Sequence, residues 1–545
     1  METFEQIVGT LNDLVWSTPS FFPFMVALLL SFGIFITLRL GFVQIRHFKH
    51  GIQTVMGKYD QPDAIGDVNH FQALTTALSA TVGIGNIAGV AIAIHYGGPG
   101  ALFWMWVTAF FGMAVKYTEC TLAVKYRIQN SDGSVSGGPM YYIEKGLGEQ
   151  WKWLAVFFAA MAVICSFLTG NAVQANTVAD TLKSTFLIPG WVTGLATASV
   201  VGFVIIGGIK RIGRVTASLM PIMALIYVLG ALVILLLNAD KVLPAFGTIL
   251  EYAFTPKAGA FGVGSGLFLT TLVWGIKRGL FSNEAGQGSA PIAHGAAKTK
   301  EPVREGVVAL LEPFIDTLVV CTMTGLVIVS TGVWEQKHDT VFTTNALEAT
   351  IEIDNNGTTL QFENGEPVNG LVHRNDFPYG SFYVDAERNT LFNGQLELLE
   401  DGKVAIYSMD GESLGELQTS IVENGAPLTA LAFENGLSPL FSGGKYIVTL
   451  CVILFGISTA ISWSYYGDRS IQYLAGDGSI IYYKVVYLIM HFLGAILALE
   501  TVWAIGDIAL GLMTFPNIIA LFALSGVVAT ATKTYFNSIK AHDKA

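Results

Sequence analysis

The stretch GGPGALFWMWVTAFFG occupies residues 97–112, within a run of 48 residues, 68–115, that contains no Asp, Glu, Lys or Arg. One helical crossing of a bilayer needs about 20 mainly apolar residues, so this run is long enough for two crossings. Charged residues make up only 13% of the whole chain, about half of the fraction usual in soluble domains. These features predict an all-α, polytopic membrane protein.

We predict eleven transmembrane spans from the apolar runs. By residue number they cover 19–40, 71–96, 100–124, 153–179, 190–208, 215–237, 259–292, 306–332, 445–466, 481–500 and 503–526. Basic residues cluster after the first, third, fifth, seventh and last spans, at 39–58, 125–152, 210–214, 298–304 and 533–544. All five clusters fall on one side, which the positive-inside rule assigns to the cytoplasm. We therefore expect a multi-pass protein of the bacterial cytoplasmic (inner) membrane, with the N-terminus outside and the C-terminus cytoplasmic.

The longest polar segment, 335–444, is predicted to form an extracytoplasmic insert. It carries 18 Asp and Glu against 4 Lys and Arg, a net charge of −14, whereas the whole chain carries −11. Asn-Gly and Asp-Gly pairs between short apolar runs are hairpin signals. Such pairs recur here in ENGE (363–366), FNGQ (392–395), EDGK (400–403), MDGE (409–412) and ENGA (423–426). We expect a small, acidic, β-rich domain between two parts of a transmembrane domain, 1–334 and 445–545.

Two of the predicted spans are interrupted by closely spaced glycines. The interruptions lie in ALSATVGIGNIAGV (77–90) and GIKRGLFSNEAGQGS (275–289). When the first span is set aside, ten spans remain, and they divide into two sets of five that each begin with an interrupted span. Interruptions at matching positions of two halves indicate a midplane binding site in inverted-repeat transporters, whose free helix ends suit an amino acid zwitterion. Close helix packing through glycine is the alternative interpretation.

The same segments resemble the alanine or glycine:cation (sodium) symporter family. The resemblance rests on GGPGALFWMWVTAFFG, on GIGNIAGV before it and on FSNEAGQGSAPIAHGAA (281–297), and it covers all the spans but not the acidic insert. It implies a LeuT-like 5+5 inverted repeat after one extra N-terminal helix. It also implies Na⁺-coupled import of alanine, glycine or similar small neutral amino acids by alternating access, with Na⁺ as the coupling ion and no other cofactor.

The resemblance also assigns roles to single residues. Main-chain amides around Gly83, Gly85 and Asn86 are expected to hold the substrate carboxylate, while Phe281 and Trp463 enclose its side chain. The full set expected around the substrate is Thr81, Gly83, Gly85, Asn86, Gln174, Phe281, Thr459 and Trp463. By analogy with the LeuT-like second sodium site, Na⁺ is expected at Ser79, Val82, Ser458, Thr459 and Ser462. Thr459 belongs to both sets, so a shift of one helical turn in one of them stays open.

Charged residues inside spans are costly and are usually paired or functional. Arg278 and Glu284 flank the second interruption and are interpreted as a structural pair. Lys116 and Glu119, three residues apart near the end of a span, are interpreted as a mutual pair whose side chains reach toward the interface. Asp316 and Asp507 are open to three interpretations, as gates, as proton sites or as ties between helices, and the sequence does not choose among them. His95, His294 and His491 form no metal-binding set and are assigned no role.

Enzyme chemistry is not predicted, because the chain has no Walker-type glycine loop and no HExxH pair. Within transport, proton coupling and a larger neutral substrate such as glutamine are alternatives. A membrane sensor whose outer insert binds a ligand is the alternative from another class, although an anchor needs no interrupted spans. The expected partners are the amino acid, Na⁺ and lipid, without nucleic acid. The particular amino acid, its stereoisomer, the coupling stoichiometry and the oligomeric state stay open.

Overall fold

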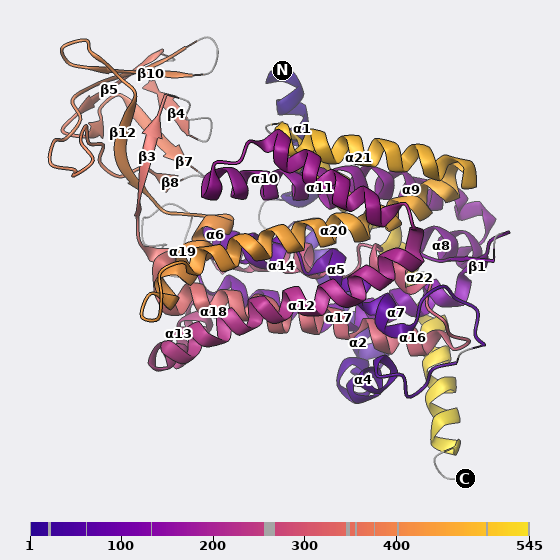
Figure 1. The fold of residues 1–545 in the computed structure, drawn as a ribbon. Helices are drawn as coiled ribbons and strands as arrows, with labels where there is room; N and C mark the ends of the chain where they lie inside the picture. Colours follow the sequence, from indigo (N-terminus) through magenta and orange to yellow (C-terminus); the bar gives the residue numbers. More distant parts are fainter. Residues whose placement is uncertain are drawn as a thin grey trace.

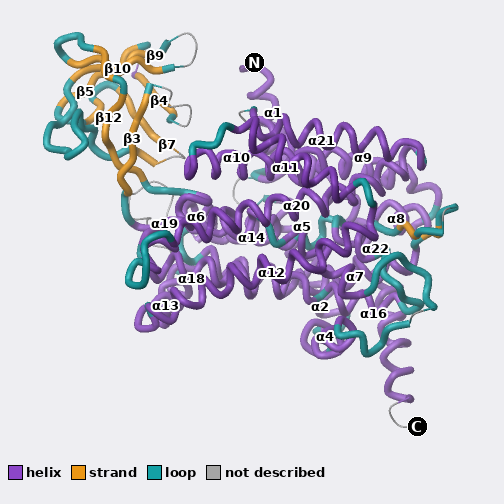
Figure 2. The backbone as a smooth tube through the Cα atoms, in the orientation of Figure 1, coloured by secondary structure: helices purple, strands orange, loops and turns teal. Residues whose placement is uncertain are grey.

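The protein is mostly helical, with a β-domain at one end of its helical part (Figures 1 and 2). The structure, a computed structural model, describes residues 2–542 except 20–22, 62, 132, 256–267, 345–348, 355–356, 375–376, 400–402 and 498–499. Six of the described helices are long and apolar enough to cross a membrane, or seven if one bent pair counts as one span. Two shorter apolar helices are α2 (Phe24–Arg39) and α11 (Gly190–Ile205). The chain is therefore a polytopic membrane protein, while the total of eleven spans stays a prediction.

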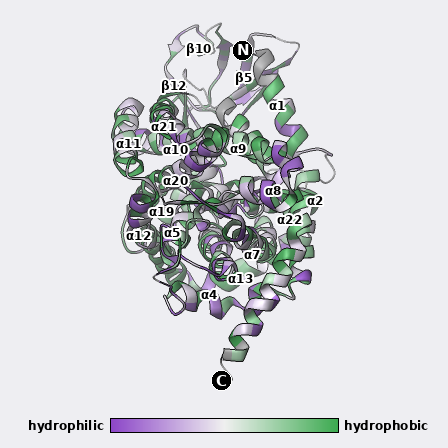
Figure 3. Ribbon diagram, turned by 90° about the vertical axis from the view of Figure 1, so that its right-hand side faces the viewer, coloured by the Kyte–Doolittle hydropathy of each residue, from purple (hydrophilic) through white to green (hydrophobic). Residues whose placement is uncertain are grey.

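Apolar residues cover much of the helical part (Figure 3). Its remaining longer elements are α1 (Glu2–Trp16), α4 (Phe48–Val55), α8 (Pro139–Leu147), α9 (Lys152–Phe167), α10 (Val173–Phe186), α12 (Gly208–Leu237), α13 (Ala239–Phe254), α18 (Thr322–Thr331), α20 (Gly444–Ala475), α21 (Ile480–Ile496) and α22 (Glu500–His542). Short pieces are α3 (Val43–Arg46), α17 (Leu311–Pro313) and two π-helical segments, η3 (Leu168–Ala172) and η4 (Phe314–Cys321). π-Helical turns are rare and occur mostly at functional sites.

The first predicted interruption is confirmed. Helix α5 (His70–Thr81) ends before Val82, and the chain continues as the π-helical η1 (Gly85–Gly89) and α6 (Val90–Gly97), bent by 53° from α5. A Cβ on Gly83 would lie 2.6 Å from the Thr459 hydroxyl oxygen. Glycine at position 83 therefore lets α20 approach the broken helix closely.

The second predicted interruption is confirmed as well. Helix α14 (Phe268–Asn283) ends at Asn283, and residues 284–289 form turns before α15 (Ala290–His294). Residues 259–267 of this predicted span lie outside the described residues. The opening motif forms the first half of α7 (Ala101–Tyr126), which packs against α14 and α16 (Pro302–Ala309). A Cβ on Gly275 would lie 2.4 Å from the Ala101 carbonyl oxygen, so this contact between α14 and α7 also depends on glycine.

The predicted insert contains a β-domain with its own apolar core. One sheet has the order β11-β10-β9-β5-β6, a second has β4-β7-β8, and β12 pairs with β3. The strands are β3 (His338–Thr343), β4 (Thr350–Ile353), β5 (Thr359–Glu363), β6 (Glu366–Pro367), β7 (Gly370–Arg374), β8 (Phe377–Pro378), β9 (Gly394–Leu398), β10 (Val404–Ser408), β11 (Ser413–Leu414) and β12 (Glu416–Ile421). The core includes Phe342, Leu360, Phe362, Phe392 and Leu396.

Two of the predicted hairpins form where expected. In ENGE, Glu363 pairs with Glu366 across Asn364 and Gly365, whose φ angles of 50° and 78° are those of the left-handed region that this tight turn requires. MDGE joins β10 to β11. Most of EDGK, residues 400–402, lies outside the described residues, and FNGQ leads directly into β9.

The prediction of a hairpin at ENGA (423–426) is wrong. The Asn424 side chain accepts a hydrogen bond from the Gly425 amide and caps a helix, α19 (Gly425–Leu437), a common use of Asn. Helix α19 packs on α18 and α20. The β-strands of the insert therefore end at Ile421, and its last part belongs structurally to the helical part.

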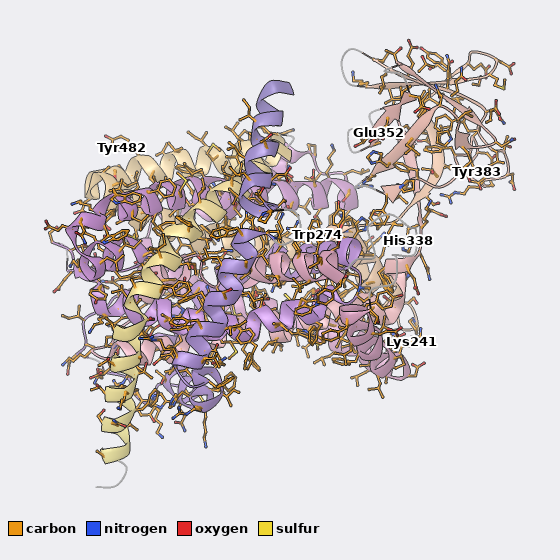
Figure 4. All side chains as sticks on the ribbon, turned by 180° about the vertical axis from the view of Figure 1, so that it is seen from behind. Lys241, Trp274, His338, Glu352, Tyr383 and Tyr482 are labelled. Carbon is orange, nitrogen blue, oxygen red and sulfur yellow. The ribbon has the colours of Figure 1, made fainter. Side chains whose placement is uncertain are left out.

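Phe377 of the β-domain contacts the first broken helix. Phe377 is buried, with its ring centroid 4.1 Å from that of His95 and 6.4 Å from that of Tyr96 at the end of α6. Tyr96 in turn stacks on Trp274 of α14 at 4.5 Å. Figure 4 shows Trp274 among the helices and His338 where the β-domain joins them.

A short hairpin, β1 (Ile128–Gln129) with β2 (Val135–Ser136), lies at the end of the helical part away from the β-domain (Figure 1). Beside it, the Arg127 guanidinium donates hydrogen bonds of 2.6–3.0 Å to four main-chain carbonyls. The acceptors are Ile65, Gly295, Ala297 and Thr299. Arg127 thus joins the segment before α5 to the segment after α15.

Candidate functional site

A small cavity lies where the two broken helices meet η3, α10, α20 and α22. Seven of the eight residues predicted to surround the substrate line it. The complete lining is Ala80, Thr81, Gly83, Ile84, Gly85, Thr169, Gln174, Phe281, Glu284, Thr459, Trp463 and Leu510. Sequence reasoning did not select Thr169, Glu284 and Leu510 for this site, because residues on different helices have no common spacing in the sequence.

One wall of the cavity carries unsatisfied polar groups. Gln174 donates from Nε2 to the Thr169 carbonyl at 3.0 Å, while its Oε1 and the Thr169 hydroxyl have no hydrogen-bond partner in the described protein. Buried polar atoms are normally satisfied. An unsatisfied acceptor beside a cavity is therefore available to a polar ligand.

Two aromatic side chains, those of Trp463 and Phe281, also line the cavity. Trp463 is 2% exposed, and its ring packs against Tyr466. Phe281 lies beside Gly85, where a Cβ would come within 3.4 Å of the Phe281 ring. Both aromatic residues line the cavity together with Gly83 and Gly85 of the first interruption.

Asn86 is the one predicted substrate residue that does not line the cavity. Its Nδ2 donates to Asp316 Oδ1 at 2.7 Å and to Ser282 Oγ at 3.2 Å, and its Oδ1 accepts from the Gly83 amide at 2.8 Å. The Gly83 amide is therefore already bonded. Asn86 connects the first interruption to the end of α14 and to η4.

Asp316 of η4 also takes part in the hydrogen bonds that connect the first interruption to the end of α14. Its Oδ2 accepts hydrogen bonds from the hydroxyls of Ser282 and Thr317 at 2.8 and 2.7 Å, and its side chain is fully buried. Each carboxylate oxygen thus has a neutral donor. The sequence did not choose a role for Asp316, and the structure places it between both interruptions.

The residues predicted to bind Na⁺ lie together between α5 and α20. Thr459 Oγ1 donates to the Ser79 carbonyl at 3.1 Å. The hydroxyls of Ser79, Ser458 and Ser462 are buried without a hydrogen-bond partner in the described protein. Thr459 also lines the cavity, so the two predicted sets share this residue in space as well as in sequence.

The predicted pair of Arg278 with Glu284 is wrong. Glu284 accepts a hydrogen bond from the Ser289 hydroxyl, whereas Arg278 lies over the rings of Trp274 and Phe281 and interacts electrostatically with Asp507. Helix α14 ends between the two residues, so Glu284 turns away from the face that carries Arg278.

The expectation for Lys116 and Glu119 is also wrong. Both side chains are fully buried and do not reach an interface. The Lys116 ammonium forms an ion pair with Glu312 at 3.0 Å, while Glu119 accepts hydrogen bonds from the Gly288 amide and from Asn517. A buried ionic group pairs across the bundle because no water is available to it there.

The similarity of this chain to known proteins extends over nearly its whole length. The model described as the sodium:alanine symporter family matches residues 1–360 and 406–545, which leaves out part of the β-domain. The chain is 41% identical over 542 residues to the sodium/alanine symporter AgcS of Methanococcus maripaludis, covering 99% of each. It is 34% identical to the putative sodium/proton-dependent alanine carrier protein YrbD of Bacillus subtilis, covering 97% of this chain and 92% of that protein. It is 31% identical to the probable sodium/glutamine symporter GlnT of the same organism, covering 98% and 92%.

Proposed function

Because this chain belongs to the sodium:alanine symporter family, we propose that the cavity between its two helix breaks binds the transported substrate. The chain is a sodium-coupled symporter of small amino acids. Two features of the cavity support it as the site. Its lining residues come from both interruptions, and they include Gln174, whose Oε1 has no hydrogen-bond partner in the described protein.

The polarity of the helix ends determines where we place the ammonium and carboxylate groups of the amino acid substrate. The last carbonyls of α5, near Ala80 and Thr81, lie beside the cavity and suit the ammonium group. The first amides of η1, around Gly85, suit the carboxylate, because the first N–H groups of a helix lack internal partners. Gln174 Oε1 provides a further acceptor for the ammonium. Asn86 acts through Gly83 and Asp316 and is a positioning residue.

The Trp463 and Phe281 rings restrict the substrate side chain to a small group. Alanine and glycine fit this restriction. A small neutral amino acid is therefore the proposed substrate, with glutamine as the competitor to be tested.

Na⁺ is proposed to bind between α5 and α20. The main-chain oxygens of Ser79 and Val82 and the hydroxyls of Ser458, Thr459 and Ser462 form a set of neutral oxygen donors. In this set, the hydroxyls of Ser458 and Ser462 are buried and have no partner in the described protein, and a hard cation would satisfy them. Since this site joins a broken helix to α20, bound Na⁺ would hold the cavity in its substrate-binding geometry.

We further propose that the cavity opens alternately to the two faces of a bacterial inner membrane. The N-terminus and the β-domain are placed outside and the segment held by Arg127 inside, following the positive-inside rule. A LeuT-like arrangement of two five-helix repeats is the fold proposed to carry the movement, since the two interruptions begin the two sets.

The test is uptake of radiolabelled alanine by the purified full chain in proteoliposomes, with and without an inward Na⁺ gradient. We expect accumulation that depends on Na⁺ and is competed by excess glycine. Uptake that ignores the Na⁺ gradient would contradict the proposed coupling, and stronger competition by glutamine than by glycine would contradict the small substrate.

A further inference from the structure

The segment 39–58, which follows α2, carries positive charge that the protein itself does not pair. The sequence from 14 to 59 contains no Asp or Glu. Arg39, Arg46, Lys49 and Lys58 are all exposed, and within the described residues none of them forms an ion pair. Helix α4, in the middle of this segment, lies at the end of the helical part away from the β-domain and near the C-terminus (Figure 1).

Large apolar side chains are exposed between these cations. Ile45 is 63% exposed and Met56 is 80% exposed, and the Phe42 and Ile52 side chains are exposed as well. Lys49, Ile52 and Met56 are spaced by three and four residues, so they share one side of α4 and of the residue that follows it. A surface on which cations alternate with apolar side chains is typical of a segment that lies at the interface between membrane and water.

The turn before this segment also presents an apolar ring. Gly41 and Phe42 have φ angles of 61° and 57°, and together they redirect the chain from α2 into α3 and α4. A residue with a side chain adopts this left-handed conformation at a cost that glycine avoids. The Phe42 ring is nevertheless left largely uncovered by the protein. Acyl chains would cover the ring where this turn meets a bilayer.

The opposite side of α4 is fixed to the helical part. A Cβ on Gly51 would lie 2.3 Å from the Val307 carbonyl oxygen, so α4 lies very close to α16. Phe48 packs edge-on against Phe314 of η4, with the ring centroids 4.8 Å apart. The exposed side is therefore held in place by the protein before any ligand binds, which lowers the entropic cost of binding.

We propose that the exposed side of segment 39–58 binds anionic phospholipids of the leaflet at the face proposed to be cytoplasmic. Arginine and lysine donate charge-assisted hydrogen bonds to phosphate oxygens, and each basic residue near an anionic membrane surface adds to the binding. The residues proposed to hold the phosphate groups are Arg39, Arg46, Lys49 and Lys58. The residues proposed to lie among the acyl chains are Phe42, Ile45, Ile52 and Met56.

The apolar side chains favour a phospholipid over a soluble anion as the ligand. A free phosphate would use the four cations and leave Ile45 and Met56 exposed, whereas a phospholipid supplies an anion and an apolar chain together. The proposal uses the membrane orientation proposed above, and it is independent of the transported substrate and of the coupling ion.

The test titrates phosphatidylglycerol into the full chain in detergent, with phosphatidylcholine as the lipid without net charge. Met56→Cys provides the site for an environment-sensitive fluorophore, because all four native cysteines are buried. Leu243→Cys in α13 is the matched control, since Leu243 is 79% exposed. Nearby Lys241 lies at the end of the helical part nearer the β-domain (Figure 4).

We expect phosphatidylglycerol to shift the emission of the label at position 56 to shorter wavelength, and added salt to weaken this response. Phosphatidylcholine should act only at much higher concentration, and the label at position 243 should respond equally to both lipids. Equal midpoints for the two lipids at position 56 would overturn the proposal. The same shift with inorganic phosphate would identify a soluble anion as the ligand and would also overturn it.

Two double variants of the labelled chain test which cations bind the lipid. Arg46→Gln with Lys49→Gln should raise the midpoint for phosphatidylglycerol roughly thirtyfold, as the loss of two basic residues at an anionic surface implies. Lys183→Gln with Lys241→Gln removes the same charge from two exposed positions in α10 and α13 and should leave the midpoint unchanged. Equal increases in both double variants would show an effect of net charge alone and would overturn the assignment to segment 39–58.

Discussion

The indole of Trp463 lies directly on Gly170, where a Cβ would come within 2.3 Å of Trp463 Cγ. Gly170 belongs to η3, the π-helical segment that also carries Thr169 of the cavity wall. The position of the Trp463 ring is therefore set by the absence of a side chain on a neighbouring helix. This relationship determines how much room the substrate side chain has.

Trp463→Ala should enlarge the cavity. We expect alanine affinity to fall roughly tenfold, about 1.4 kcal/mol, because the ring no longer packs on the substrate. Leucine and glutamine should become effective competitors of alanine uptake. An unchanged competition profile would show that Trp463 does not bound the substrate.

Gly170→Ala should act in the opposite direction. The added methyl group displaces the Trp463 ring toward the cavity, so alanine uptake should fall more than glycine uptake. Gly247→Ala is the matched control, because nothing lies within 4 Å of a Cβ at Gly247 in α13. Equal losses for the two substrates would point to general distortion of η3 instead.

Gln174→Ala should weaken substrate binding without preventing membrane insertion. The variant removes the free Oε1 acceptor, and a lost hydrogen bond to a charged group is worth about 1.5–3 kcal/mol, so we expect the alanine KM to rise at least tenfold. Asn176→Ala on the same helix, whose amide bonds to the Leu497 carbonyl instead, is the control. Poor expression of Gln174→Ala alone would favour a role in helix packing.

Ser458→Ala and Ser462→Ala should each raise the Na⁺ concentration needed for half-maximal uptake. Each removes a hydroxyl that has no partner within the described protein. The expected shift is about tenfold, as for one lost hydrogen bond to a charged group. Ser464→Ala is the control on the same helix, because its hydroxyl is already bonded to the Ile461 carbonyl at 2.7 Å. A similar shift in all three variants would exclude a specific Na⁺ site here.

Replacement of residues 338–421 by a short Gly/Ser linker should preserve Na⁺-dependent uptake. The cavity and the Na⁺ donors lie outside this segment, and α19 stays in place. Salt sensitivity should change, because the acidic domain no longer acts near the face proposed to be external, where screening limits its reach to about 8 Å. Loss of alanine binding in a monodisperse deletion protein would place the β-domain within the transport machinery, with Phe377 as the first contact to examine.

The sequence predicted features that depend on local chemistry. Glycines at 83 and 85 located the first interruption, and Asn364-Gly365 located a hairpin, because both residue types adopt backbone conformations that others avoid. ENGA was misread since Asn424 suits a helix cap as well as a turn. An Asn-Gly pair can form a tight turn or begin a helix, and the residues that follow it determine which of the two structures forms.

Pairings across the bundle could not be predicted in the same way. Lys116 and Glu312 are 196 positions apart, and Asn86 and Asp316 are 230 apart. Only the packing of helices brings such groups together. Arg278 and Glu284 were expected to pair because they flank the second interruption, but α14 ends between them and the two side chains have different partners.

The connection between the segment before α5 and the segment after α15 depends on the side chain of Arg127. Its four acceptors are main-chain oxygens, which every amino acid presents in the same way. The stretches that it joins can therefore change their side chains during evolution without losing this connection. Position 127 has no such freedom, because lysine offers three donors on one atom and cannot spread them across a planar fork. Side chains in the two joined segments can thus be substituted without loss of this connection, provided that residue 127 is an arginine.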